Sequence, residues 1–164
     1  MKTVLLDKRR RNRAGFDCGV ETLNNYLKMM ASQQAVKDNS RTFILEDPHR
    51  EERIVGYYTL TMTRIEMERL PDSLSKRHKS NQSAGLIARL AVDRRYSGQG
   101  YGAFLLVDAL RRLLQASDLV AFPLVVVDAM DGVAGFYKNM GFTPFNDVDG
   151  SLFMTMADVR RSLA

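Results

Sequence analysis

Cysteine is scarce in this chain of 164 residues, and long apolar segments are absent from it. Cys18 is its single cysteine, which excludes an internal disulfide and fits a reducing cytoplasm. No apolar run reaches the ~18 residues that a membrane-spanning helix requires. Near the start, the apolar patch at residues 4–6 (Val-Leu-Leu) is far shorter than a signal-peptide core. We therefore expect a cytoplasmic protein without a membrane segment.

Internal repeats, low-complexity tracts and linkers are also missing, so one domain over residues 1–164 is the expectation. With 45% hydrophobic and 26% charged residues, the composition is that of an ordinary globular protein. Periodicity and turn residues predict strands at 4–6, 41–46, 54–63, 85–92, 124–127 and 152–156. They predict helices over about 20–36, from the following glycines to about 117, and from a cap at Asp131 to about 139. Asp17 is predicted to cap the first helix, and a basic tail to follow the last strand. This order indicates a mixed α/β (α+β) domain around one sheet.

Acidic residues are outnumbered, because 19 Asp and Glu face 24 Lys and Arg, which gives a formal net charge of +5. This balance favours a polyanionic partner such as nucleic acid or a phosphorylated cofactor, but a solvated basic surface explains it equally well. Two short stretches concentrate the charge, and they contain Lys8, Arg9, Arg10, Arg11 and Arg13, and Lys76, Arg77, His78 and Lys79. Charge alone leaves both interpretations open.

The stretch RRYSGQGYG, residues 94–102, joins an expected strand to an expected helix. The first turn of a helix presents unpaired N–H donors and the positive end of the helix dipole. Three glycines leave these donors open to an anion, although each costs roughly 0.5–1 kcal/mol relative to alanine inside a helix. Residues 94–107 contain no carboxylate, and Arg94 and Arg95 add positive charge. The stretch therefore predicts a phosphate site rather than a turn that is merely tight.

Two common phosphate motifs do not fit this stretch. A nucleotide P-loop requires Gly-Lys followed by Ser or Thr, and the chain has no such tripeptide. A dinucleotide fingerprint requires Gly-x-Gly-x-x-Gly, whereas residues 98–102 read Gly-x-Gly-x-Gly. The spacing therefore argues against both kinds of nucleotide site.

Residues 95–100, Arg-Tyr-Ser-Gly-Gln-Gly, resemble the coenzyme A signature of GNAT-type N-acetyltransferases, Arg/Gln-x-x-Gly-x-Gly/Ala. The resemblance implies the GNAT fold, a single mixed and mostly antiparallel sheet flanked by helices. It also implies acetyl-CoA as co-substrate, bound at a splayed central strand pair, and no metal. The implied cofactor contacts are Leu90, Ala91 and Val92 along the pantetheine arm, and Arg95, Gly98, Gln99, Gly100, Tyr101, Gly102 and Ala103 around the pyrophosphate.

The stretch AGFYKNMGF, residues 134–142, is similar to the family's helix that carries Phe-Tyr followed by Gly-Phe. The resemblance implies that Tyr137 lies near the sulfur of acetyl-CoA and acts as general acid toward the leaving thiolate. A phenol suits this role, because its reference pKa of about 10 lies above the ~8.5 of a thiol. Without the resemblance, core packing beside Phe136 is the preferred interpretation of Tyr137.

A general base has no clear candidate in the sequence. His49 and His78 stand in charged, loop-like stretches, and alternating surface charge explains Glu66 and Glu68 equally well. An α-amine, with a reference pKa of about 7.7–8.0, is partly neutral at physiological pH, unlike a lysine amine at about 10.4. The missing base therefore favours an α-amine acceptor. Cys18 is expected to be a partly buried residue without a covalent role.

Several segments are similar to one GNAT branch, the toxins of bacterial type II toxin–antitoxin modules that acetylate aminoacyl-tRNA and block translation. These segments are FDCGVETLNNYL (16–27), SRT (40–42), ARLAVD (88–93) and VDA (127–129). The resemblance implies direct attack by the α-amine of aminoacyl-tRNA, whose phosphates bind basic side chains. The candidate tRNA contacts are Arg89, Arg9, Arg10, Arg11 and Arg41.

This branch also implies a cognate antitoxin, often a ribbon-helix-helix protein, and a homodimer. Two alternatives remain open at this point. One is a GNAT enzyme that acetylates a small-molecule or protein amine without a toxin role. The other is a non-enzymatic module that binds nucleic acid or a protein through its basic surface.

Overall fold

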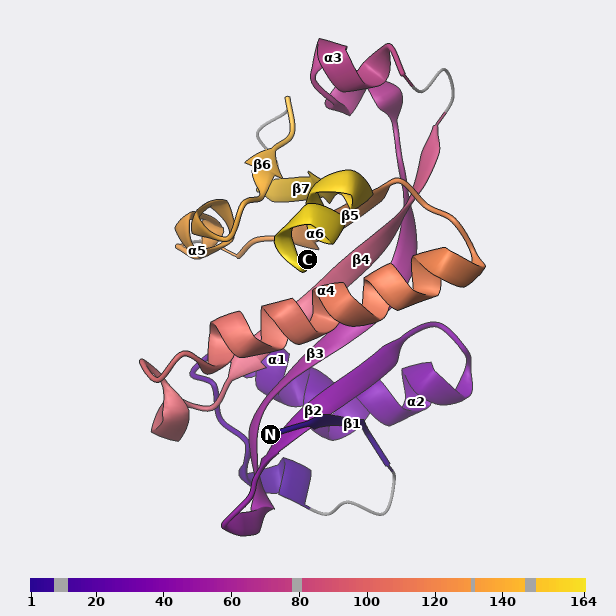
Figure 1. Ribbon diagram of the computed structural model, residues 1–164. Helices are drawn as coiled ribbons and strands as arrows, with labels where there is room; N and C mark the ends of the chain where they lie inside the picture. Colours follow the sequence, from indigo (N-terminus) through magenta and orange to yellow (C-terminus); the bar gives the residue numbers. More distant parts are fainter. Residues whose placement is uncertain (8–11, 78–80, 131, 147–149) are drawn as a thin grey trace. The chain divides into compact units, whose positions relative to one another are not determined.

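The computed structural model describes residues 1–7, 12–77, 81–130, 132–146 and 150–164 (Figure 1). Over these ranges the strands form a seven-stranded sheet with the order β1-β2-β3-β4-β5-β7-β6. Two compact units share the chain, and they comprise Met1–Thr61 with Ala88–Ala109 (unit 1) and Met62–Ile87 with Leu110–Ala164 (unit 2). Several residues named from the sequence lie outside the described ranges, namely Lys8, Arg9, Arg10, Arg11, His78, Lys79 and Asp131.

The six predicted strands are confirmed, and β6 is an additional short strand that the sequence did not predict. The bounds are β1 (Thr3–Leu5), β2 (Arg41–Asp47), β3 (Arg50–Ile65), β4 (Gln82–Val92), β5 (Leu124–Asp128), β6 (Thr143–Pro144) and β7 (Ser151–Thr155). β1 with β2, β2 with β3, β5 with β7, and β6 with β7 are antiparallel, whereas β4 with β5 is parallel. The sheet is therefore mixed and mostly antiparallel, as predicted.

The helices follow the predicted order with two corrections. They are α1 (Glu21–Asn25), α2 (Ala31–Val36), α3 (Asp72–Ser75), α4 (Tyr101–Leu119), α5 (Ala134–Asn139) and α6 (Met156–Ser162), with a π-helical turn η2 (Tyr26–Met30) between α1 and α2. Asp17 does not cap α1, because Val20 holds the N-cap position without a side-chain hydrogen bond. The segment predicted as a basic tail forms the helix α6, which was not expected: Thr155 Oγ1 accepts from Asp158 N at 3.1 Å at its start, and Arg160 and Arg161 lie in its last turn.

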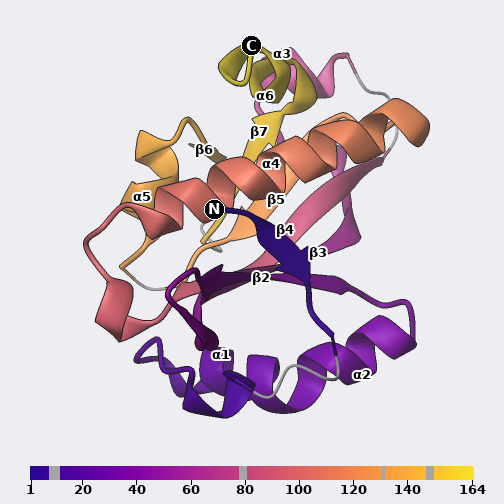
Figure 2. The same ribbon diagram turned by 60° about the horizontal axis from the view of Figure 1, so that its bottom comes forward.

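In unit 1, neighbouring tyrosines on β3 join its sheet to helices on both faces. Alternate side chains of a strand point to opposite faces. Tyr57 Oη donates to the Leu23 carbonyl of α1 at 2.7 Å, whereas Tyr58 Oη donates to the Asp108 carboxylate of α4. Figure 2 shows this arrangement, with α1 and α2 on one face of β2 and β3 and the beginning of α4 on the other. Both tyrosines are fully buried, so each hydroxyl needs the partner that it has.

β3 approaches β4 closely in unit 1 at Gly56. A Cβ at this glycine would lie 2.6 Å from the carbonyl oxygen of Ala91 and 2.7 Å from Leu105 Cδ1. No side chain fits at these distances, so glycine is required where β3 passes the end of β4. Ala91 belongs to the strand segment that the sequence predicted to hold pantetheine.

In unit 2, β5 lies between the first half of β4 and β7. Its parallel register with β4 runs from Ala84–Leu124 to Ile87–Val127, and its side chains from Leu124 to Val127 are buried. β4 continues beyond this register through Ala88–Val92, in unit 1. Asn146, in the loop after β6, donates from its side-chain amide to the Leu70 carbonyl at 2.8 Å.

Candidate active site

The glycine-rich stretch forms an open turn at the start of α4. Gly98 and Gly100 have φ of +76° and +86°, which L side chains rarely adopt. Both glycines are exposed, and a Cβ at either would have no atom within 4 Å. Phe104 N donates to the Gly100 carbonyl at 3.1 Å, which makes Gly100 the residue from which the helical hydrogen bonds begin. The N–H groups of residues 101–103 therefore lack helical acceptors, as an anion site requires.

Arg95, predicted to contact the cofactor, forms an ion pair within the turn. It lies in the short 3-10 turn η4 (Arg94–Tyr96), and its Nε and Nη2 donate to the Asp93 carboxylate at 3.0 and 2.9 Å. Asp93 is only 1% exposed. Burial favours the neutral form of Asp93, but hydrogen bonds from Arg95 and from the amide of Asp17 outweigh it and lower the pKa of the carboxyl. The sequence placed Arg95 correctly in the turn but missed its partner.

Arg94 and Tyr96 also bind carboxylates. The Arg94 guanidinium contacts Asp17, and the Tyr96 hydroxyl donates to Asp47 at the end of β2. The hydrogen bond from Gly19 N, followed by those from Asn24 and Arg94, lowers the pKa of the Asp17 carboxyl. The hydrogen bond from the Tyr96 hydroxyl is the leading cause of the lowered pKa of Asp47. Sequence reasoning missed all three aspartates. Asp93 adjoins the motif, but no spacing links it to Asp17 or Asp47.

The predicted pantetheine segment, Leu90–Val92, is the end of β4 in unit 1. Ala91 is buried, whereas Leu90 and Val92 are partly exposed on the other face of the strand. Immediately after it, Asp93 N donates to the Val55 carbonyl at 2.8 Å, which fixes the strand end beside β3. The segment therefore presents a partly exposed edge next to the glycine-rich turn.

Tyr137 lies in α5 of unit 2 and is 6% exposed. Its ring centroid is 5.1 Å from that of Phe136 and 5.8 Å from that of Phe142, both in edge-to-face geometry. Burial, with a smaller contribution from the Asp128 carboxylate, raises the pKa of Tyr137 to about 12. Among the residues that the structure describes, the hydroxyl has no hydrogen-bond partner. A buried phenol with a retained proton can act as a donor to a group that comes within hydrogen-bond distance.

The Gly-Phe pair after α5 explains how Tyr137 is held. Gly141 has φ of +103°, and its N–H donates to the Lys138 carbonyl at 3.0 Å, as in a glycine that ends a helix. Phe142 N then donates to the Tyr137 carbonyl at 3.0 Å. The turn brings the Phe142 ring back against the tyrosine. Gly141 therefore follows the C-cap residue Met140 and ends α5.

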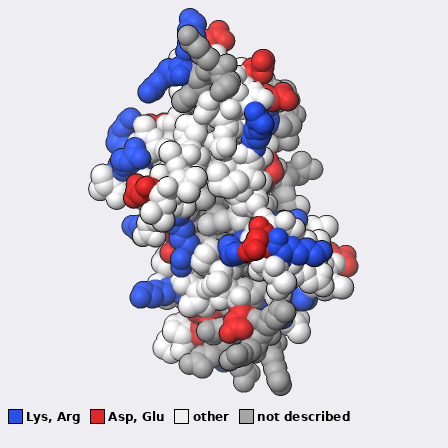
Figure 3. All heavy atoms as spheres, turned by 90° about the vertical axis from the view of Figure 1, so that its right-hand side faces the viewer, with Lys and Arg blue, Asp and Glu red and all other residues white. Residues whose placement is uncertain are grey.

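Two of the candidate tRNA contacts, Arg89 and Arg41, lie among the described residues, and each contacts a side chain of unit 1. The Arg89 guanidinium carbon lies 3.7 Å from the Tyr26 ring centroid, on the face of β4 opposite Leu90. Arg41 is exposed and pairs with Asp38 at 2.6 Å. Arg9, Arg10 and Arg11 fall outside the described ranges. On the face in Figure 3, basic side chains are interspersed with acidic and uncharged ones.

The residues considered as a base or a nucleophile remain weak candidates. His49, Glu66 and Glu68 are exposed. Burial raises the pKa of the Cys18 thiol, so this group is less nucleophilic than an exposed cysteine. Within the described ranges, His, Cys, Asp and Glu form no group of three or more that could hold a metal ion. No helix in the same part of the chain is long and apolar enough to cross a membrane.

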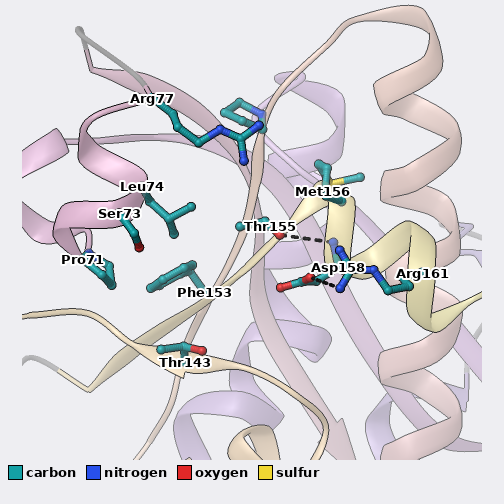
Figure 4. Close-up of a pocket in the computed structure, with 12 residues that line it drawn as sticks. Pro71, Ser73, Leu74, Arg77, Thr143, Phe153, Thr155, Met156, Asp158 and Arg161 are labelled. Atoms are coloured by element: carbon teal, nitrogen blue, oxygen red, sulfur yellow. Dashed lines mark hydrogen bonds and ion pairs between the residues drawn. The ribbon is translucent and has the colours of Figure 1, made fainter.

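Unit 2 contains a cavity of about 480 Å³ that none of the predicted site residues lines. Figure 4 shows Leu74 and Phe153 on one side of it, and Thr155, Asp158 and Arg161 on the other. Arg161 pairs with Asp158 at 3.3 Å. The residues that line this cavity therefore include neither Tyr137 nor any residue of the glycine-rich turn.

Comparison with known proteins agrees with the geometry of the turn. Residues 38–144 match the family model described as an acetyltransferase (GNAT) domain. A tRNA-acetylating toxin of Mycobacterium tuberculosis is 31% identical over 146 residues, which cover 88% of this chain and 86% of that protein.

Two solved structures share the fold over almost the whole chain. AtaT complexed with acetyl-methionyl-tRNAfMet is 29% identical, with a TM-score of 0.91 and 99% of both chains covered. A tyrosine-to-phenylalanine mutant of AtaT, bound to acetyl-CoA and to the C-terminus of the antitoxin AtaR, is 28% identical, with a TM-score of 0.84 over 99% of this chain and 98% of that one. The chain therefore belongs to the GNAT family of acetyltransferases.

Proposed function

We propose that this protein is the toxin of a type II toxin–antitoxin module and transfers the acetyl group of acetyl-CoA to the α-amine of aminoacyl-tRNA. The observation that carries the proposal is the open turn at the start of α4, in a chain whose relatives include a tRNA-acetylating toxin. Acetylation blocks the amine that would form the next peptide bond, so translation is inhibited. Residues 1–164 act as one catalytic domain in the cytoplasm.

The turn binds the pyrophosphate of acetyl-CoA through backbone amides. Residues 98–103 supply N–H groups, and the first turn of α4 adds the positive end of its dipole without an acidic side chain to compete. The backbone of Leu90–Val92 pairs with the amides of the pantetheine arm, as an added strand would. The structure of an AtaT mutant with acetyl-CoA supports the choice of cofactor.

The transfer is a direct attack of the amine on the thioester carbonyl. The C–N bond forms, the C–S bond breaks, and the nitrogen then loses a proton to solvent. Tyr137 acts as general acid by directing its O–H at the leaving sulfur. Because its pKa of about 12 lies above that of a thiol, the phenol shares its proton with the developing thiolate in the transition state. The departing CoA thiolate then takes a proton from solvent, and Tyr137 ends the step protonated.

The acceptor follows from the chemistry and from the relatives together. An α-amine with a reference pKa of about 7.7–8.0 needs no strong base. AtaT complexed with acetyl-methionyl-tRNAfMet supports an aminoacyl-tRNA acceptor, and the complex with AtaR supports a cognate antitoxin. The ribbon-helix-helix class of that antitoxin, the homodimer, and tRNA contacts at Arg89, Arg41, Arg9, Arg10 and Arg11 remain predictions from the resemblance.

Incubation with labelled acetyl-CoA and total charged tRNA tests this function. We expect the label on the α-amine of aminoacyl-tRNA and none on tRNA that has been stripped of its amino acids. Release of labelled N-acetylamino acid after mild alkaline hydrolysis identifies the species. Label on protein lysines or free small amines instead would favour the alternative of a GNAT enzyme without a toxin role.

A further inference from the structure

Three consecutive residues at the start of the glycine-rich turn are each held by a different aspartate. Arg94 binds Asp17, Arg95 binds Asp93, and Tyr96 binds Asp47. We call Asp17, Asp47 and Asp93 the aspartate anchor. These residues come from three separate segments of unit 1: the segment before α1, the end of β2 and the end of β4.

Asp93 is the centre of the anchor. Besides the Arg95 side chain, its carboxylate accepts from Arg95 N at 2.9 Å and from Asp17 N at 3.0 Å. Both oxygens are therefore used, and the group is almost fully buried. A buried carboxylate with this many donors is rigid, and the loss of its charge leaves the donors poorly satisfied.

The segment that carries Asp17 is itself fixed on α1. Asp17 Oδ1 accepts from Gly19 N at 2.9 Å and from Asn24 Nδ2 at 3.0 Å, and the Asp17 carbonyl accepts from Arg94 N at 2.9 Å. Gly19 makes room for the pair, since a Cβ there would lie 3.3 Å from Arg94 Cδ. The turn is thus tied through Asp17 to the first helix.

We infer that the aspartate anchor positions the turn for the pyrophosphate, and that Arg95 is part of this anchor rather than a phosphate ligand. The inference rests on the proposed cofactor. The Arg95 guanidinium donates two N–H groups to Asp93, whereas a Cβ at Gly98 or Gly100 would meet no atom within 4 Å, so the backbone there is open. A turn that is fixed before binding loses less conformational entropy when the ligand arrives. Backbone amides, not arginine charge, then hold the phosphates.

A double-mutant cycle on Asp93 and Arg95 tests the assignment through CoA binding. We measure the Kd of CoA by calorimetry for the wild type, Asp93→Asn, Arg95→Gln and the double variant. Each single change is expected to raise the Kd about tenfold, and the double variant also about tenfold, because both changes break one anchor. If Arg95 contacts phosphate independently of Asp93, the two effects multiply to about a hundredfold, and the inference is wrong.

A truncated acetyl donor distinguishes a displaced turn from a general structural defect. Acetyl-pantetheine lacks the pyrophosphate, so both single variants are expected to lose much less of kcat/KM with it than with acetyl-CoA. An equal loss with acetyl-pantetheine would mean a general structural defect and would overturn the inference. Asp38→Asn is the matched control, because it weakens an exposed Asp–Arg pair in unit 1 far from the turn in sequence. It should not change the Kd of CoA.

Tyr96→Phe keeps the test decisive if Asp93→Asn does not fold. This change removes only the hydroxyl that binds Asp47 and is expected to raise the Kd of CoA about threefold, with acetyl-pantetheine unaffected. An unchanged Kd for Tyr96→Phe and for Arg95→Gln would overturn the inference. A wild type that binds no CoA would instead overturn the proposed function, so the two failures are distinguishable.

Discussion

The glycine-rich turn of unit 1 and the tyrosine helix of unit 2 are held in opposite ways. The turn is fixed by polar contacts to three aspartates and leaves its glycine backbone open. Tyr137 is fixed by two aromatic rings and leaves its hydroxyl without a partner in the described part of the chain. In each region, the group without a partner among the described residues is the one to which the proposed function assigns the chemistry.

This difference follows from what binding and bond breaking require. A phosphate needs several donors at fixed positions, and hydrogen bonds to buried carboxylates fix a backbone well. A leaving thiolate needs one proton donor, and apolar packing both aims the ring and keeps its proton in place. A hydrogen-bond partner that held Tyr137 would occupy its hydroxyl, and apolar side chains packed on the turn would cover its N–H groups.

Tyr137→Phe should produce the largest effect, because it removes the free hydroxyl and leaves the aromatic packing intact. We expect kcat to fall by roughly 10²–10⁴-fold, the range of general acid catalysis, while the Kd of CoA stays the same. Single-turnover acetyl transfer and calorimetry measure the two quantities. Growth arrest on induction should be lost as well.

A second buried tyrosine provides the control for this change. Tyr58→Phe removes a hydroxyl that donates to Asp108, so it should lower stability but keep most of kcat below the melting temperature. If Tyr137→Phe retains normal turnover and toxicity, the hydroxyl is a packing feature and the assigned role is wrong.

The pH dependence of stability should separate the two regions next. Burial raises the pKa of Tyr137 from about 10 in the unfolded chain to about 12 in the fold. The fold thus disfavours the ionised form. The contribution of the Tyr137 phenol to the free energy of unfolding is fully present below pH about 10 and is lost as the pH rises through about 12. Between pH 8 and pH 11, the free energy of unfolding of the wild type should therefore fall by about 1.4 kcal/mol more than that of Tyr137→Phe.

Urea unfolding of both proteins at these two pH values measures the difference. An equal loss in both proteins would mean that Tyr137 is solvated in the folded state. The turn should contribute nothing to this difference, because Tyr96, whose pKa is also raised by burial, and the carboxylates of the aspartate anchor are the same in both proteins.

Gly98→Ala should act on the turn and leave the tyrosine helix unaffected. The space is open, but φ of +76° costs an L-residue about 1–2 kcal/mol, so the turn relaxes away from its binding geometry. We expect the Kd of CoA to rise roughly 5–30-fold, with kcat at saturation nearly unchanged. Gly132→Ala is a matched control, since φ there is +87° with equally open space in unit 2.

Gly132→Ala should lower stability by a similar amount without weakening CoA binding. If Gly98→Ala binds CoA as well as the wild type does, the left-handed conformation at this glycine is not part of the binding site.

Much of the fold was predictable because its signals are local. Alternating and continuous apolar runs predicted six strands, and glycines marked the turn before α4 and the end of α5. The segment over about 20–36 was predicted as one helix, but η2 interrupts it, because a π-turn has no distinct hydrophobic period. The two-residue β6 gives no pattern at all, since its pairing with β7 depends on tertiary contact.

The site was predictable only where one segment carried its chemistry. The turn and Tyr137 each lie within a short motif. The partners of Arg94 and Arg95 were missed, and both charges were expected to face an anion. Asp17 lies far from Arg94 in sequence, and Asp93 lies two residues from Arg95, but its burial against the turn depends on the fold. The fold brings these residues together, and only then does the paired state of the arginines become visible.

Arg94→Gln should give the smallest effect on CoA binding. It tests whether the exposure of an ion pair or its position in the turn decides how strongly the pair holds the turn. The Arg94 and Asp17 side chains are 68% and 44% exposed, and ion pairs of this kind contribute about 0.2–1 kcal/mol. The Kd of CoA should therefore change by less than about threefold, against about tenfold for Arg95→Gln. Arg161→Gln, which weakens an exposed pair in unit 2, should change stability similarly and CoA binding not at all. If Arg94→Gln weakens CoA binding as much as Arg95→Gln does, the turn attracts its anion through arginine charge, and the contrast between a polar anchor and an open backbone fails.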